Sequence, residues 1–167
     1  YTHGHSLRVS NYSVAIGRAI GLRDEAIQQI EIGGCVHDIG KIGVRETVLN
    51  KPGPLTEEEW TTMRTHPVRG EEICKPLRSL ERVLPIIRHH HERWNGTGYP
   101  DGLTTAAIPL GARVVAVADV FDALTSDRPY RAALSRDAAL AYLAAEAGHT
   151  LDDAVVAALL GLVRGDD

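Results

Sequence analysis

The stretch that decides the fold is residues 37–41, His37-Asp38-Ile39-Gly40-Lys41. An imidazole next to a carboxylate, with a lysine three residues further on, is typical of a metal site rather than of a packed core. The rest of the chain is organised around this stretch, because further candidate ligands lie before and after it. They are His5, His66, His89, His90, His91 and Asp119.

Length and composition favour one domain with a single core, since the chain has 167 residues, of which 44% are hydrophobic and 24% charged. Aromatic residues are few, which suits close-packed helices. The net charge of -4 argues against a broad basic face, so neither DNA nor RNA is expected as a partner. Neither a run of eighteen apolar residues nor a basic-then-apolar leader occurs, so we expect a cytoplasmic protein without a membrane segment.

Hydrophobic periodicity and capping signals predict an all-α domain of about seven helices, with the metal centre among the core helices. The second helix begins at Asp24 and ends at Gly40, which places His37 and Asp38 in its last turn. Thr56 and Glu59 form a capping box at the start of the third. Segments 41–55 and 93–109 are predicted as loops. The seven expected helices cover 6–20, 24–40, 56–66, 77–91, 113–124, 136–147 and 153–163.

The run 113–124 is locally ambiguous, because its valines favour a strand although its apolar residues follow no clean alternation. We interpret it as a buried central helix, since its neighbours are helical. Asp119 lies inside this run, and a buried carboxylate needs a partner. Asp119 is therefore a candidate ligand.

The number of histidines and aspartates exceeds what one metal ion needs. Imidazole and carboxylate without thiolate suit iron, manganese, zinc or nickel better than a structural zinc cage. An aspartate beside a histidine can bridge two metals, and two metals about 3.5–4 Å apart activate a shared hydroxide for phosphoryl displacement. Lys41 could place a positive charge on the developing phosphorane. The pattern predicts a metal-dependent phosphohydrolase.

His37-Asp38, with a distant His5 and Asp119, resembles the ligand order of the HD phosphohydrolase superfamily. The run 90–100, HHERWNGTGYP, resembles the signature of its HD-GYP branch, and HDIGKIG (37–43), KPGPLT (51–56), THP (65–67) and VADVFDALTSDRPYR (117–131) match in the same order. The resemblance covers nearly the whole chain, so we expect residues 1–167 to be an HD-GYP domain cut from a longer protein. It implies an all-helical fold and a di- or trinuclear centre, usually of iron or manganese.

The resemblance also implies the role of each matching residue. Asp38 would be the bridging, catalytic carboxylate, and Lys41 would contact the scissile phosphate. Arg128 and Arg131 would hold substrate phosphates. The metal ligands would be His5, His37, Asp38, His66, His90, His91 and Asp119, and the signature loop that shapes the rim would contain Gly96, Gly98, Tyr99 and Pro100.

Two positions depart from the family pattern. Tyr1 stands where trinuclear members have a glutamate, and a neutral phenol is a poor substitute for a carboxylate, so two metal ions are expected. Asn95 replaces the aspartate that commonly precedes Gly-x-Gly-Tyr-Pro, which we interpret as a tolerated turn change.

The resemblance implies hydrolysis of cyclic di-GMP to linear pGpG by a metal-bridged hydroxide, with further hydrolysis to GMP less favoured if a third metal is absent. Three alternatives stay open: a phosphodiesterase for another cyclic dinucleotide such as cyclic GMP-AMP, a sensing or protein-interaction module without turnover, and a nucleotide phosphohydrolase from elsewhere in the superfamily. Diguanylate cyclase or adaptor domains are candidate partners. The sequence leaves open whether the chain forms a homodimer.

Overall fold

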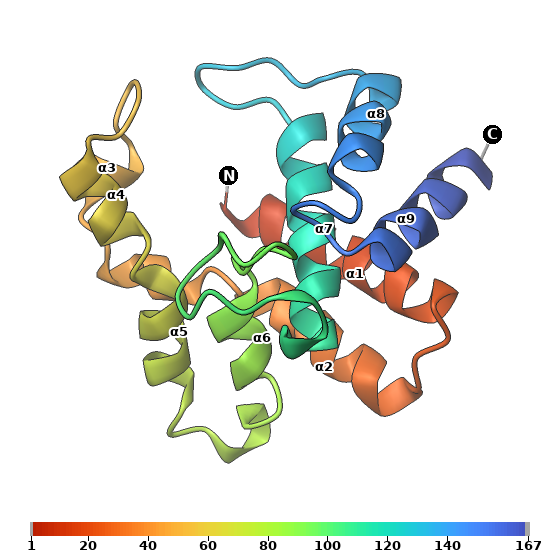
Figure 1. Ribbon diagram of the computed structural model, residues 1–167. Coiled ribbons are helices and arrows are strands. Elements are labelled where there is room, and N and C mark those ends of the chain that lie inside the picture. Colours follow the sequence, from red (N-terminus) through yellow and green to blue (C-terminus); the bar gives the residue numbers. More distant parts are fainter. Residues whose placement is uncertain (1, 166–167) are drawn as a thin grey trace.

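The computed structural model describes residues 2–165, and all of its regular elements in that range are helices (Figure 1). This confirms the all-α prediction. Three short 3-10 helices, η1 (Ile39–Gly43), η2 (Arg78–Leu80) and η3 (Thr105–Ala107), link the longer elements. The α-helices in the described residues are α1 (Thr2–Ala19), α2 (Asp24–Val36), α3 (Glu46–Leu49), α4 (Glu57–Met63), α5 (His66–Cys74), α6 (Leu84–His89), α7 (Leu110–Thr125), α8 (Arg136–Glu146) and α9 (Asp153–Gly165).

Helix α7 is the centre of the fold, as the interpretation of 113–124 required. It contacts α1, α2, α6, α8 and α9 and lies in the middle of the molecule in Figure 1. Val114, Val115, Val117 and Ala118 are fully buried, because this helix is apolar on nearly every side. They belong to one core cluster with residues such as Ile16 of α1. The core therefore holds α7 in place, and with it Asp119.

The junction after α2 differs from its predicted form. The helix ends at Val36; His37 keeps helical angles (φ -53°, ψ -35°), whereas Asp38 (φ -95°, ψ 9°) leaves them. A hydrogen bond from the Lys41 N–H to the Asp38 carbonyl then opens η1. The prediction that Asp38 lies in the last helical turn is wrong, because the tighter 3-10 turn begins there.

Two prolines explain where helices α5 and α6 begin. The Thr56–Glu59 capping box is present at the start of α4, as predicted. Pro67 occupies the first turn of α5, so that His66 begins a new helix. The predicted helix 77–91 is reduced to η2 and α6, since Pro85 lies in the first turn of α6 and cannot continue an earlier helix.

The predicted loop 41–55 contains α3 in addition to η1, which with α5 raises the number of helices above the expected seven. Among residues 2–165, none of the helices combines the length and apolarity needed to cross a membrane.

Candidate metal centre

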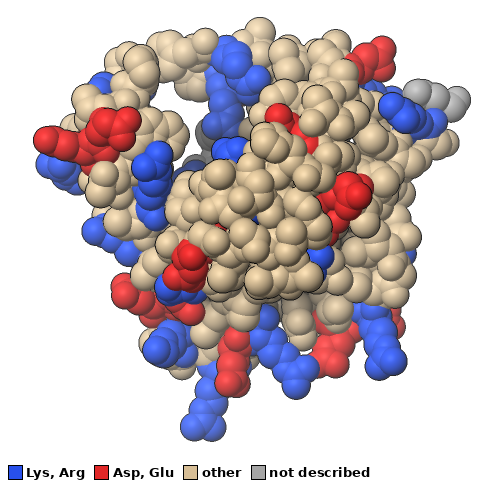
Figure 2. Space-filling model, in the orientation of Figure 1, with Lys and Arg blue, Asp and Glu red and all other residues tan. Residues whose placement is uncertain are grey.

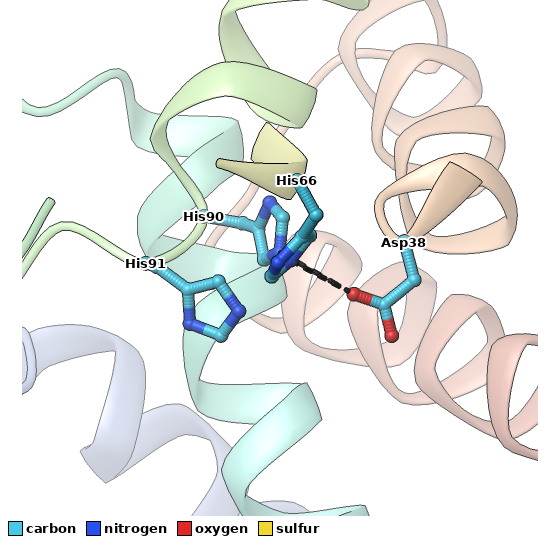
Figure 3. Close-up of side chains that lie close together, drawn as sticks. All are labelled: Asp38, His66, His90 and His91. Carbon is cyan, nitrogen blue, oxygen red and sulfur yellow. Dashed lines mark hydrogen bonds and ion pairs between the residues drawn. The ribbon is translucent and has the colours of Figure 1, made fainter. Parts of the chain in front are cut away.

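Five separate parts of the chain bring the predicted ligands together. His5 comes from α1, Asp119 from α7, and the others from the junction after α2, the first residue of α5 and the end of α6. Three groups have ligand atoms within 4.8 Å of one another, and two of them consist of the predicted metal ligands. The first contains Asp38, His66, His90 and His91, which point toward a common space in Figure 3, and the second contains His5, His37 and Asp119.

Asp38 joins the two groups through its two carboxylate oxygens. Its Oδ1 lies 3.3 Å from His66 Nε2 and 3.7 Å from His90 Nε2. Its Oδ2 lies 3.3 Å from His37 Nε2 and 3.7 Å from His5 Nε2. Each oxygen thus faces a different group, which is the arrangement of a carboxylate that bridges two metal ions.

Hydrogen bonds on the outer side orient the histidine rings. The Nδ1 atoms of His37, His66 and His90 each lie 2.7–2.8 Å from a backbone carbonyl three residues earlier. A carbonyl can only accept, so Nδ1 carries the proton and Nε2 is directed at the centre as a ligand.

Among residues 2–165, two buried polar atoms of the centre have no hydrogen-bond partner. His37 Nε2 and Asp38 Oδ1 are buried without a hydrogen bond. His66 Nε2 and His90 Nε2 face each other at 3.3 Å, although both rings have their protons on Nδ1. Buried polar groups normally find partners, and cations would satisfy all of these atoms at once. The residues present therefore fit divalent metal ions.

Burial and neighbouring charges shift the pKa values of the candidate ligands. Burial disfavours charge on His5, but hydrogen bonding to Asp119, Asp38 and Asp122 outweighs it and raises the pKa of His5 to about 10. Burial also opposes the charge of Asp38, yet His37 holds its pKa well below the usual range. Burial lowers the pKa of His91, so that this ring is neutral and ready to coordinate.

Gly40 allows η1 to approach α5. A Cβ atom at this position would lie 1.8 Å from the His66 carbonyl oxygen and 2.6 Å from the Gly70 nitrogen. Both neighbours are backbone atoms, so a side chain cannot be accommodated by a rotamer change. The glycine of the HDIGK stretch is therefore what allows His66 to approach Asp38.

Lys41 lies at the edge of the centre, and its Nζ donates to Asp38 Oδ2 at 2.9 Å. Its side chain is 37% exposed, so the ammonium group faces both the centre and solvent.

The signature loop lies against His91. The ring of Tyr99 stacks on the His91 ring with centroids 5.0 Å apart, and Tyr99 is joined to Pro100 by a cis peptide bond. Gly98 packs so closely that a Cβ there would lie 2.4 Å from the His91 carbonyl oxygen. Gly96 closes a turn by donating its N–H to the Arg93 carbonyl. Together these residues form one wall beside the ligands.

Glu92 and His89 support this loop and form the third group with Asp101. Glu92 is buried and accepts hydrogen bonds from the N–H groups of Asp101 and Leu103. His89 Nδ1 lies 3.3 Å from a Glu92 oxygen, and Arg88 pairs with Asp101. The polar atoms of Glu92, His89 and Asp101 thus have partners within the protein.

Arg128 and Arg131 lie on the exposed segment between α7 and α8. They line a surface pocket with Leu49 and Lys51 and belong to neither ligand group. Tyr1 lies outside the described residues.

One supporting residue was missed by the sequence reasoning. Asp122 is 1% exposed, accepts a hydrogen bond from His5 Nδ1 at 2.7 Å and pairs with Arg8 at 2.5 Å. It therefore fixes the orientation of His5. Its position three residues after Asp119 on the same helix is the signal that could have identified it.

Comparison with known proteins agrees with this geometry. The HD domain family model matches residues 2–155. The chain is 48% identical to the cyclic di-GMP phosphodiesterase response regulator RpfG of Xanthomonas campestris, over 92% of this chain and 41% of that protein. It is 39% identical to 3'3'-cGAMP-specific phosphodiesterase 3 of Vibrio cholerae, over 95% of this chain and 35% of that protein. The chain thus spans less than half the length of these relatives.

The fold also has a close counterpart among solved structures. Bd1817, an HDG"Y"P protein from Bdellovibrio bacteriovorus, superposes with a TM-score of 0.78 at 22% identity, over 99% of this chain and 53% of that one. The family resemblance inferred from the motifs is confirmed, and the chain belongs to the HD domain family.

Proposed function

We propose that this domain is a cyclic di-GMP phosphodiesterase that produces linear pGpG, acting in the cytoplasm with two divalent ions, iron or manganese. The observation that carries the proposal is Asp38, whose two oxygens face two separate groups of metal ligands while Lys41 contacts it from the open side. The names of its relatives, which include cyclic di-GMP phosphodiesterases, support the choice of substrate.

The ligand residues have distinct tasks in this proposal. Asp38 would bridge the ions, His66, His90 and His91 would complete one site, and His5, His37 and Asp119 the other. Two bound metals would supply an activated nucleophile and stabilise the attacking and leaving oxygens. Lys41 would stabilise negative charge on the phosphate, since its ammonium group is already held at 2.9 Å from Asp38.

Two adjoining surface pockets support the roles proposed for Arg128 and Arg131, because they connect Lys41 to the place where the arginines could hold the substrate phosphate that is not cleaved. One surface pocket contains Asp38, Lys41 and Leu49, and the next contains Leu49, Lys51 and the two arginines. Leu49 therefore lies where the two pockets meet. Figure 2 shows Lys and Arg side chains along the opening between the α3–α4 region and the segment between α7 and α8. A dianionic substrate would be attracted along this path.

Cyclic GMP-AMP is the second candidate substrate, because similar proteins of Vibrio cholerae are named as phosphodiesterases for it. Parallel turnover of the two nucleotides separates the candidates, and a strong preference for the mixed nucleotide would contradict our choice. A sensing or protein-interaction role with diguanylate cyclase or adaptor domains would require binding without turnover.

The first experiment is chromatographic analysis of products after cyclic di-GMP is incubated with protein loaded anaerobically with Mn(II) or Fe(II). Asp38→Ala is compared with Asp24→Ala, which removes an exposed carboxylate from the start of α2. Conversion to pGpG by the wild type and the control, but not by Asp38→Ala, is expected. Absence of conversion at full metal occupancy would overturn the phosphodiesterase reading. Metal analysis is expected to give two ions per chain, and three would contradict the binuclear proposal.

A further inference from the structure

A pocket between α4 and the signature loop, with His91 in its wall, has features of a nucleobase site. It is a cavity of about 690 Å³ whose walls include Trp60, Arg64, His91, Arg93 and Tyr99. His91 is a candidate metal ligand, so the cavity borders the centre directly. Trp60 and Arg64 come from α4 and its C-cap, and none of the α4 residues is buried in the core. Core packing therefore gives no reason for a tryptophan at this place.

The arginine is held between two aromatic rings. The Arg64 guanidinium carbon lies 5.7 Å from the centroid of Trp60 and 5.9 Å from that of Tyr99. Tyr99 is in turn backed by its stacking on His91. Cation–π contacts of this kind orient a guanidinium group while leaving its N–H donors available. The pocket thus presents aromatic faces and a guanidinium group at one site.

The charge of the pocket is not neutralised by nearby acids. Across residues 2–165, neither Arg64 nor Arg93 forms an ion pair with a carboxylate. The N–H donors of both guanidinium groups are therefore available to a ligand that carries hydrogen-bond acceptors.

We propose that the Trp60–Arg64 pair binds one guanine base of the substrate, in an inference that rests on the proposed function. A guanidinium group donates two hydrogen bonds to O6 and N7 of guanine, whereas adenine offers N7 as an acceptor and presents an amino donor beside it. The base stacks on the exposed ring of Trp60, because Arg64 and His91 already lie against the ring of Tyr99. Unpaired bases stack on aromatic side chains in this way in other recognition sites. Arg64 is thus a specificity-determining residue for guanine over adenine.

The test compares Arg64→Ala, Arg64→Lys and Trp60→Ala with the wild type on cyclic di-GMP, cyclic di-AMP and the base-free diester bis(p-nitrophenyl) phosphate. Arg82→Ala is the matched control, because this exposed arginine pairs with the exposed Glu25 at the protein surface. We expect Arg64→Ala to raise KM for cyclic di-GMP about 10-fold or more, with kcat/KM for the base-free diester unchanged within about twofold. Arg64→Lys keeps the charge but loses the two-pronged geometry, so the preference for guanine is lost.

Other outcomes overturn the inference in recognisable ways. An unchanged KM for cyclic di-GMP refutes it. If Arg64→Ala loses activity equally on all three diesters, Arg64 acts in the phosphate chemistry or in the fold. If Arg64→Ala loses activity equally on both cyclic dinucleotides and Arg64→Lys restores it, Arg64 contacts a phosphate. Equilibrium binding of cyclic di-GMP by calorimetry is measured alongside turnover. Tight, Arg64-dependent binding without turnover would refute the proposed function and leave the base pocket standing, while no binding by the wild type would refute both.

Discussion

Gly40→Ala tests whether the HDIGK stretch works by close backbone approach. The added Cβ would lie 1.8 Å from the His66 carbonyl oxygen, so α5 must retreat by about 1.6 Å to restore an ordinary contact of 3.4 Å. Both atoms that the new Cβ would meet belong to the backbone, which cannot move aside as a side chain can. We therefore expect the free energy of unfolding to fall by about 3 kcal/mol, the upper end of the range for overpacked sites. For a domain of this size the loss corresponds to a fall in Tm of about 6–12 °C.

The same displacement should disable the metal site. Coordination tolerates errors of about 0.2 Å, and a shift of 1.6 Å in His66 exceeds that several-fold. Urea unfolding followed by circular dichroism gives the free energy, and elemental analysis gives the bound metal. Gly161→Ala is the control, because an exposed Cβ on α9 meets nothing within 4 Å and should stabilise the helix by about 0.5–1 kcal/mol. Wild-type stability and metal content in Gly40→Ala would refute the reasoning.

Two further predictions concern metal binding. Asp122→Asn keeps the size of the side chain but weakens its hold on His5, so metal affinity should fall about 10–100-fold by calorimetric titration; an unchanged affinity would show that Asp122 serves only to pair with Arg8. The pKa of His5 is raised from 6.5 to about 10. In protein freed of metal by a chelator, the contribution of His5 to the free energy of unfolding is therefore full below pH 6.5 and is lost as the pH rises toward 10. A metal ion at His5 must displace the proton that this side chain binds. The gain in Tm on loading Mn(II) should therefore grow from pH 6 to pH 9. A gain that shrinks over this range would contradict the assignment of His5 as a ligand.

Local sequence signals were sufficient for elements that depend on local physics. The Thr56 capping box follows from hydrogen bonding within a few residues, and it was predicted. The boundary at Asp38 was not, because the 3-10 turn that follows depends on the packing of η1 against α5. Tertiary contacts of this kind leave no periodic pattern in the chain.

The candidate ligands could be chosen from the sequence because imidazole and carboxylate groups in this order match a known family. Their supporting contacts could not be chosen in the same way. The sequence shows only that Asp122 lies three residues after Asp119, and its contact with His5 exists only when α1 is placed against α7. The pocket of Trp60 and Arg64 likewise forms only when α4 meets the loop that carries Tyr99.

The arrangement of the ligands also makes the centre a cross-link between two unequal parts of the protein. Most buried side chains belong to the large cluster around α7, while residues of α5 and α6 enclose a small one of Cys74, Val83 and Ile87. His66 and His90 extend from the small part toward Asp38, and His5 and Asp119 from the large one. Bound metal ions would therefore add a second connection between the two parts to the one made by Ile86 of α6, which packs in the large cluster. The domain's rigidity and its chemistry would then depend in part on the same atoms.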